Sequence, residues 1–120
     1  MIKPQWWLER AAVRKLELAA AVDQLRERLP SYPGVRGALV FGSFARDDVG
    51  PESDLDLVVV RETELPPLRR DDDIRRTLDL DVPYDLVTVT LEQYERLSRE
   101  RSFFAQARRE GIWIDATRAR

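Results

Sequence analysis

The sequence contains no histidine and no cysteine among its 120 residues. Serine–histidine and cysteine–histidine catalysis, zinc fingers, haem ligation and thiol redox chemistry each need one of these residues, so all of these classes are excluded. Any catalysis must therefore come from carboxylates, hydroxyls, arginines, backbone amides or a hard metal ion.

Long hydrophobic runs are also missing. No apolar segment approaches the about 20 residues that cross a bilayer, and charged residues interrupt the N-terminal segment where a signal peptide needs an apolar core. Basic and acidic residues nearly balance at 20 and 22, for a formal net charge of -2, so no strong nucleic-acid binding is expected. We therefore predict a cytoplasmic protein with no membrane partner.

The residues that are present suffice for one folded domain. Hydrophobic residues make up 43% of the chain, which is enough for a core without disulfides or structural metals. No internal repeat or linker is found. We predict a single domain over residues 1–120, with a leading helix at 1–30 and a sheet-bearing catalytic core at 36–115.

An apolar stripe predicts a long helix over residues 5–29, ended by Pro30. The stripe comprises Leu18, Val22, Leu25 and Leu29, widened by Ala12, Leu16 and Ala19. Trp6 and Trp7, near the start of this helix, are interpreted as packing it onto the sheet, although an exposed partner-binding patch is the alternative.

Short apolar runs alternate with helical patterns through the rest of the chain. Strands are predicted at residues 38–41, 55–60, 82–89 and 112–114, and helices at 67–79 and from the capping-box pattern at Thr90 to Gly111. A short helix is also expected to start in residues 43–46. This alternation predicts an α/β (α+β) fold in which a small mixed sheet is flanked by helices.

Two aspartates open the second predicted strand. Side chains two residues apart on a strand point to the same face, so Asp54 and Asp56 present two carboxylates side by side. Such a pair favours a hard divalent cation between its members, and Mg²⁺ prefers oxygen ligands. Asp85, on a neighbouring strand, would supply a third carboxylate and complete a site for two Mg²⁺ ions.

A phosphate-binding element precedes these carboxylates. Gly42 ends the first predicted strand and lets the backbone approach a phosphate, while Ser43 adds a hydroxyl donor. Arg46 lies one helical turn further on and is expected to contact a phosphate oxygen. Together with the carboxylates, these are the groups that phosphoryl or nucleotidyl transfer requires.

The same residues resemble a known family. The segment Gly42-Ser43-Phe44-Ala45-Arg46, followed by Ser53-Asp54-Leu55-Asp56-Leu57-Val58-Val59, is similar to the signature of the minimal nucleotidyltransferase (MNT) family, which belongs to the DNA polymerase β-like nucleotidyltransferase superfamily. Tyr84-Asp85-Leu86-Val87 resembles the family's third-carboxylate strand, and Glu110-Gly111-Ile112-Trp113 resembles its last strand. The resemblance covers nearly the whole chain and implies a polymerase β-like palm fold.

The resemblance also implies residue roles. Asp54 and Asp56 would bind both Mg²⁺ ions, Asp85 would ligate the catalytic ion and help to activate the acceptor, and Gly42 and Ser43 would hold the nucleotide phosphates. The expected reaction moves AMP from ATP to an acceptor hydroxyl. Stand-alone family members are typically antitoxins, so the expected partner is a HEPN-type ribonuclease toxin that is adenylylated on a tyrosine.

Two other functions stay open at this point. One is a vestigial antitoxin that masks its partner by contact alone, favoured by Asp47-Asp48, which stands where the family usually carries glycine after the arginine. The other is nucleotidyl transfer to a small molecule such as an aminoglycoside. The chain has no second domain to form a pocket for such a substrate, which makes this possibility the weaker one.

The remaining charged and aromatic clusters are interpreted as structural. The second Asp-x-Asp, Asp79-Leu80-Asp81, lacks a preceding phosphate loop and is assigned to a helix-to-strand junction. The charge run over residues 69–76 is predicted to be a solvated helix face with i,i+4 pairs. Tyr94, Phe103 and Phe104 are assigned to the core.

Overall fold

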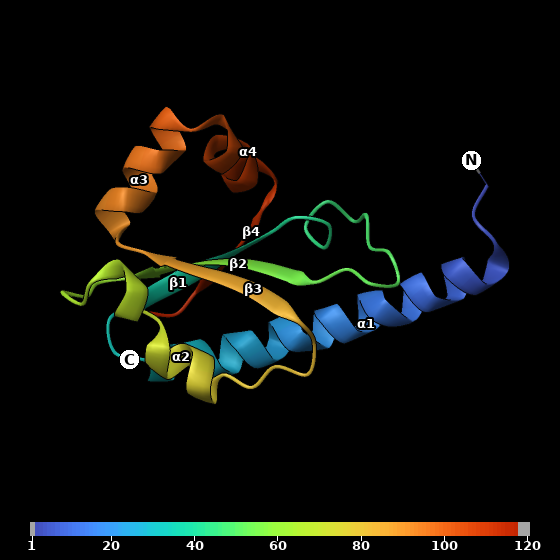
Figure 1. Cartoon of the computed structure of the whole chain (residues 1–120), viewed down its shortest axis with the longest axis horizontal. Helices are drawn as coiled ribbons and strands as arrows, with labels where there is room; N and C mark the ends of the chain where they lie inside the picture. The colour runs from blue at the N-terminus through green and yellow to red at the C-terminus, as the bar shows by residue number, and fades with distance from the viewer. Residues whose placement is uncertain (1, 118–120) are drawn as a thin grey trace.

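The computed structural model of the chain describes residues 2–117 and contains a four-stranded mixed sheet (Figure 1). The strands are β1 (Val35–Phe41), β2 (Leu55–Arg61), β3 (Tyr84–Val89) and β4 (Ile112–Asp115), in the spatial order β3-β2-β1-β4. β1 pairs antiparallel with both β2 and β4, whereas β2 and β3 run parallel. The predicted mixed sheet flanked by helices is confirmed. Met1 and residues 118–120 of the predicted domain lie outside the described residues.

Helices cover both faces of the sheet (Figure 1). The first face carries α1 (Gln5–Arg28) and α2 (Asp72–Thr77), and the second carries α3 (Leu91–Glu100) and α4 (Ser102–Glu110). Two short 3-10 turns, Leu29–Ser31 and Pro67–Arg69, precede β1 and α2. Within residues 2–117, no helix combines the length and apolar character that crossing a membrane requires.

Alternation along the strands divides the apolar side chains between two cores. In β2, Leu55, Leu57 and Val59 belong to the core under α1 and α2, whereas Val58 and Val60 belong to the core under α3 and α4. This is the two-residue period of a strand buried on both faces. The same alternation decides that Asp56 points to the α3/α4 face, because it lies two residues before Val58.

The helices differ from the sequence-based expectations in detail. The polar helix predicted at residues 67–79 is a 3-10 turn followed by the shorter α2. The helical region predicted from Thr90 is two helices, because Arg101 adopts an extended conformation with φ -119° and ψ 119°. The capping box at the start of α3 is present, with Gln93 and Thr90 exchanging side-chain hydrogen bonds with each other's backbone amides.

One part of the predicted α1 stripe is wrong. Leu18, Val22, Leu25 and Leu29 are buried, but Ala12 and Leu16 are exposed. Residues two apart on a helix differ by about 200° around its axis, so Leu16 and Leu18 point to nearly opposite sides. α1 therefore carries apolar side chains on two sides, and the sheet covers only one of them.

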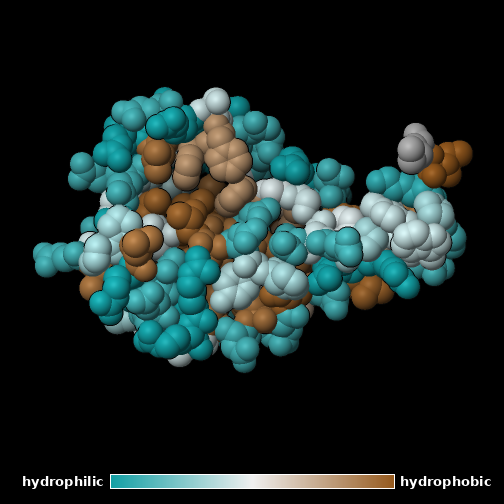
Figure 2. All heavy atoms as spheres, in the orientation of Figure 1, coloured by the Kyte–Doolittle hydropathy of each residue, from teal (hydrophilic) through white to brown (hydrophobic). Residues whose placement is uncertain are grey.

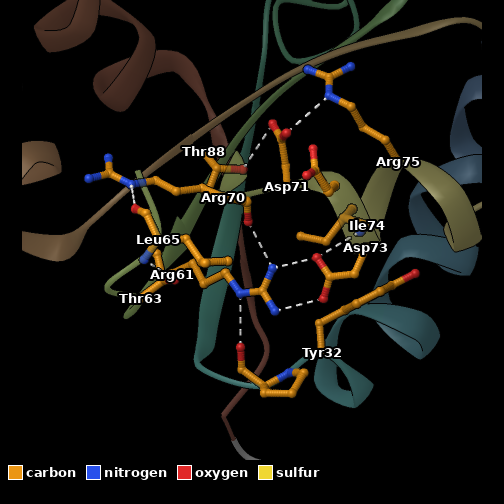
Figure 3. Close-up of polar contacts among 12 residues, drawn as sticks. Tyr32, Arg61, Thr63, Leu65, Arg70, Asp71, Asp73, Ile74, Arg75 and Thr88 are labelled. Atoms are coloured by element: carbon orange, nitrogen blue, oxygen red, sulfur yellow. Dashed lines mark hydrogen bonds and ion pairs between the residues drawn. The ribbon is translucent and has the colours of Figure 1, made fainter. Parts of the chain in front are cut away.

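A buried arginine fastens α2 to the sheet (Figure 3). Arg61 ends β2 and is only 6% exposed. Its guanidinium makes two parallel hydrogen bonds to the Asp73 carboxylate, at 2.7 and 2.8 Å, and also donates to the carbonyls of Pro33 and Arg70. The hydrogen bonds from Arg61 are the largest cause that lowers the pKa of the Asp73 carboxyl. The charge run over residues 69–76 is thus only partly a solvated face.

Candidate active site

The predicted catalytic carboxylates meet in one row across the sheet. Asp56 of β2 pairs with Phe41 of β1 on one side and with Asp85 of β3 on the other. Residues paired in register project from the same face, here the α3/α4 face. Sheet pairing therefore brings together two aspartates that are far apart in the sequence.

Asp54 completes an acidic cluster around Asp56. Partial burial, and then the negative charges of Asp85 and Asp54, raise the pKa of the Asp56 carboxyl, while the nearby Arg46 guanidinium acts in the opposite direction. The structure thus places all three predicted carboxylates, and also Arg46, within electrostatic reach of one another. A cation would relieve this repulsion, because an opposite charge favours the ionised form of a carboxyl.

Gly42 lies directly against this cluster. Its φ is +79°, in the left-handed region that favours glycine. A Cβ at this position would stand near the Asp56 carboxylate, with the Asp56 Oδ2 as its nearest contact. Only a residue without a side chain therefore fits between the first strand and the aspartates, and the backbone after β1 approaches the carboxylates closely.

The segment after Gly42 is a series of turns, and the short helix expected at residues 43–46 is absent. The amide of Arg46 donates to the Gly42 carbonyl at 3.1 Å, and the amide of Asp48 donates to the Ser43 carbonyl at 2.8 Å. Phe44 packs against the core under α1 and thereby anchors the loop to the rest of the fold. Gly42, Ser43 and Arg46 consequently lie on a compact loop at the edge of the carboxylate row.

The structure accounts for the unusual Asp47. This residue has φ 57°, a left-handed conformation in which glycine is common and aspartate is tolerated. Its carboxylate pairs with the ammonium group of Lys15 in α1, at 2.5 Å. Asp47 is therefore paired with a residue of the leading helix, and the neighbouring Asp48 is exposed.

Further contacts fasten α1 to the loop between β1 and β2. The Arg14 guanidinium donates to the Pro51 carbonyl at 3.1 Å, and the Trp7 ring lies 3.3 Å from where a Cβ of Gly50 would be. Trp6, Trp7 and Arg10 border a hollow of about 540 Å³ against residues 50–53. The prediction that Trp6 and Trp7 pack α1 onto the sheet needs correction, because the Trp7 ring meets this loop and Trp6 is 55% exposed.

The carboxylates suit Mg²⁺ by their chemistry, although they do not form a closed cage. Among residues 2–117, no three acidic side chains stand close enough to hold a metal ion by themselves. Mg²⁺ is usually bound through one or two carboxylates together with substrate phosphates and water. Asp56 and Asp85, adjacent in the sheet register, fit that mode of binding, with Asp54 next to them.

An apolar surface borders the row, and sequence reasoning missed it. Phe103 of α4, which was assigned to the core, is 61% exposed, and its ring meets that of Phe41 at 5.7 Å in a T-shaped contact. Val87 of β3 is 45% exposed. Figure 2 shows apolar side chains gathered on this side of the molecule, between β3 and α4. We call Phe41, Val87 and Phe103 the apolar shelf.

Arg75 is a second group that sequence reasoning did not assign to the site. It projects from α2 and lines a hollow of about 180 Å³ with Phe41, Asp85 and Val87. Its guanidinium pairs with Asp71 and donates to the Leu86 carbonyl on the open edge of β3. An i,i+4 pair on a helix was predicted for this run, but the contact with the edge strand depends on the fold.

A carboxylate row beside a glycine loop, at one end of a mixed sheet, is an arrangement that suits a protein that binds phosphate groups for transfer. Residues 22–113 match the family of nucleotidyltransferase domains, and the chain belongs to that family. A crystal structure from Sulfolobus solfataricus, solved at 1.40 Å and only provisionally assigned as a nucleotidyltransferase, shares the fold with a TM-score of 0.52. It is 21% identical, and the match covers 80% of this chain and 84% of the other. A comparison with curated protein sequences gives no match.

Proposed function

We propose that this nucleotidyltransferase moves AMP from ATP onto a hydroxyl, most simply a tyrosine hydroxyl, of a partner protein, with Mg²⁺ as the cofactor. We further propose that the partner is a HEPN-type ribonuclease toxin and that the chain is its antitoxin. The proposal rests on one observation: Asp56 and Asp85 lie side by side in the sheet register, and the backbone at Gly42 comes close to the Asp56 carboxylate. The antitoxin role rests on the resemblance of the motifs to the MNT family.

Each site residue has a task in this reaction. Gly42 and Ser43 hold the triphosphate, and Arg46 balances its charge. The acceptor oxygen attacks the α-phosphorus, the bond from that phosphorus to the bridging oxygen breaks, and pyrophosphate leaves. Asp85, on the edge strand β3, takes the proton of the acceptor hydroxyl in this proposal. Bound Mg²⁺ would supply charge neutralisation on the phosphates and ease the loss of that proton.

The apolar shelf supports a protein as the acceptor. Exposed aromatic and aliphatic side chains that gather in one place are typical of protein–protein contact sites. An aminoglycoside, by contrast, is polar and positively charged, and it would need acidic and hydrogen-bonding walls. Phe41, Val87 and Phe103 offer no such groups, and the neighbouring carboxylates are assigned to Mg²⁺. The apolar shelf therefore favours the flank of a folded partner around the acceptor hydroxyl.

The direct test is transfer of label from α-labelled ATP to the partner protein in the presence of Mg²⁺. We expect Asp56→Asn to lower the rate by at least about 100-fold, because catalysis here depends on charge placement. Asp79→Asn is the matched control: Asp79 belongs to the other Asp-x-Asp and has φ 48°, a conformation that asparagine also adopts. Its rate should equal that of the unchanged protein.

The same two variants separate enzymatic from contact-based neutralisation. In cells that express the toxin, Asp56→Asn should fail to rescue growth, whereas Asp79→Asn should succeed. Rescue by Asp56→Asn, with a complex that is indifferent to ATP, would instead identify a vestigial site that masks its partner by contact. The ion pair between Asp47 and Lys15 weakens the sequence argument for that alternative, and the charge of Asp48 is the part of that argument that remains.

A further inference from the structure

α1 carries an apolar stripe on the side that faces away from the sheet. Trp6 is 55% exposed, Val13 56% and Leu16 72%, and Ala20 is exposed as well. We call these four residues the outer stripe. The N-terminal part of α1 projects beyond the sheet (Figure 1), so a partner has room to approach it. Contacts of Trp7 and Arg14 with the β1–β2 loop hold this part of the helix in place.

The spacing of the outer stripe is that of paired helices. Trp6, Val13 and Ala20 recur every seven residues, and Leu16 lies three residues after Val13. In the heptad notation of coiled coils these are a positions and one d position, and such residues form the seam between two helices. The other d positions are Glu9 and Asp23, so the identity of the facing residues decides which pairing is possible.

Like charges exclude a parallel pair of identical helices. In a parallel pair each d residue meets its own copy, so Glu9 would face Glu9 and Asp23 would face Asp23. In an antiparallel pair with Val13 opposite Leu16, Glu9 faces Ala20 and Asp23 faces Trp6. The antiparallel arrangement therefore brings together apolar side chains in the middle and no like charges along the seam.

The flanking positions favour the same arrangement. On one side of the antiparallel seam, Arg10 faces the second copy's Glu17, and two-fold symmetry repeats this pair. On the other side, Ala12 faces the second copy's Ala19, and two small side chains let the helices approach. A parallel pair would instead place Arg10 beside Gln5 and Glu17 beside Ala12. Charge complementarity thus exists for a second copy in one orientation only.

From these observations we propose that α1 pairs antiparallel with α1 of a second copy of this chain through the outer stripe. The interface is isologous, because the same surface is used on both copies. It lies on the solvent side of α1, away from the apolar shelf, so it leaves the proposed acceptor surface open. The proposal does not depend on the proposed function and needs no nucleotide for its test.

Sedimentation velocity of the full chain over a wide concentration range tests the proposal. We expect a reversible dimer whose dissociation constant rises at least about tenfold for Leu16→Glu, because a charge enters the apolar centre of the seam. Leu8→Glu is the matched control, since Leu8 is 50% exposed on the same helix but outside the stripe. That variant should dimerise like the unchanged protein, and circular dichroism should show both variants folded.

A charge swap tests the orientation. Arg10→Glu and Glu17→Arg should each weaken the dimer, because each places like charges opposite one another twice, and the double variant should restore it. A protein that stays monomeric at the highest concentration would overturn the proposal. So would a Leu16→Glu variant that dimerises normally, or a double variant no tighter than the single ones.

Discussion

Asp56 shows how a site residue acts against the stability of its own fold. Its carboxyl is partly buried and faces Asp85 and Asp54, which together raise its pKa. A carboxyl whose pKa is higher in the folded chain than in the unfolded chain stabilises the fold below its unfolded pKa, and this stabilisation is lost as pH rises through the folded pKa. At neutral pH the charge of Asp56 therefore opposes folding.

The prediction at the residue scale is that Asp56→Asn raises the free energy of unfolding at pH 7 in the absence of divalent ions. Like charges on neighbouring strands cost about 0.2–1 kcal/mol, which sets the size of the expected gain. Urea unfolding measures it, with Asp79→Asn as the control that should change nothing.

Mg²⁺ extends this test. Added Mg²⁺ should stabilise the unchanged protein and should stabilise Asp56→Asn much less, because a ligand that binds the folded state shifts the unfolding equilibrium. Equal stabilisation of the two proteins would show that Asp56 does not bind the ion.

Residue-level chemistry was the part of the site that the sequence predicted best. The spacing of Asp54 and Asp56 and the strand periodicity were enough to place both carboxylates on one face, and the structure brings Asp85 to the same row. The places of Arg75 and Phe103 at the site could not be predicted. The local sequence of Arg75 does not show that the Leu86 carbonyl lies beside it, and that of Phe103 does not show that its ring stays on the surface next to Phe41.

The Arg61–Asp73 pair governs how α2 is held against the sheet. Arg61 stands at the end of an apolar run, where sequence patterns suggest that a strand leaves the core, yet its guanidinium is buried against four acceptor atoms (Figure 3). Burial of a charge is tolerated only when it is paired and hydrogen-bonded. The position of α2 depends on this contact between residues of two different elements, so hydrophobic periodicity alone cannot reveal it.

The prediction at the element scale concerns acid. Because the pKa of Asp73 is lowered by Arg61, the pair stabilises the fold at pH above the ordinary aspartate value of about 3.9, and this stabilisation is lost as pH falls through the folded pKa. Asp73→Asn should therefore cost about 1–3 kcal/mol at pH 7. Its free energy of unfolding should approach that of the unchanged protein in strong acid.

Urea unfolding at a series of pH values measures this difference. Asp72→Asn removes the exposed pair with Arg69 and should cost less than about 1 kcal/mol, as surface pairs do. If the free energy of unfolding of Asp73→Asn stays below that of the unchanged protein by the same amount down to strong acid, the effect does not come from this ion pair.

At the scale of the whole molecule, the site is a platform rather than a cleft. The break at Arg101 separates α3 from α4, and Phe103 near the start of α4 remains on the surface beside the carboxylate row. The sequence suggested one continuous helical region there, with Phe103 in the core. The capping box at Thr90 and the glycine at Gly111 mark only the two ends of this helical region, so the break at Arg101 was not predicted.

The corresponding prediction is that Phe103→Ser raises KM for the partner protein by about tenfold or more, as the loss of an aromatic anchor at an interface does. Leu68→Ser, at a residue 92% exposed on the 3-10 turn before α2, is the matched control and should leave KM unchanged. Steady-state transfer assays with varied partner concentration provide the measurement. An unchanged KM for Phe103→Ser would show that the apolar shelf does not receive the acceptor.

The register of three strands determines what a misaligned strand would do to the candidate site. Phe41, Asp56 and Asp85 share a row only because β1, β2 and β3 are aligned as they are. A slip of one residue turns every side chain of a strand to the other face, so Asp56 would enter the apolar core under α1 and Leu57 would take its place at the surface. The same misalignment would therefore bury the Asp56 charge and remove this residue from the site. The free-energy cost of burying that charge disfavours the misaligned sheet, and it thereby keeps the carboxylates in place.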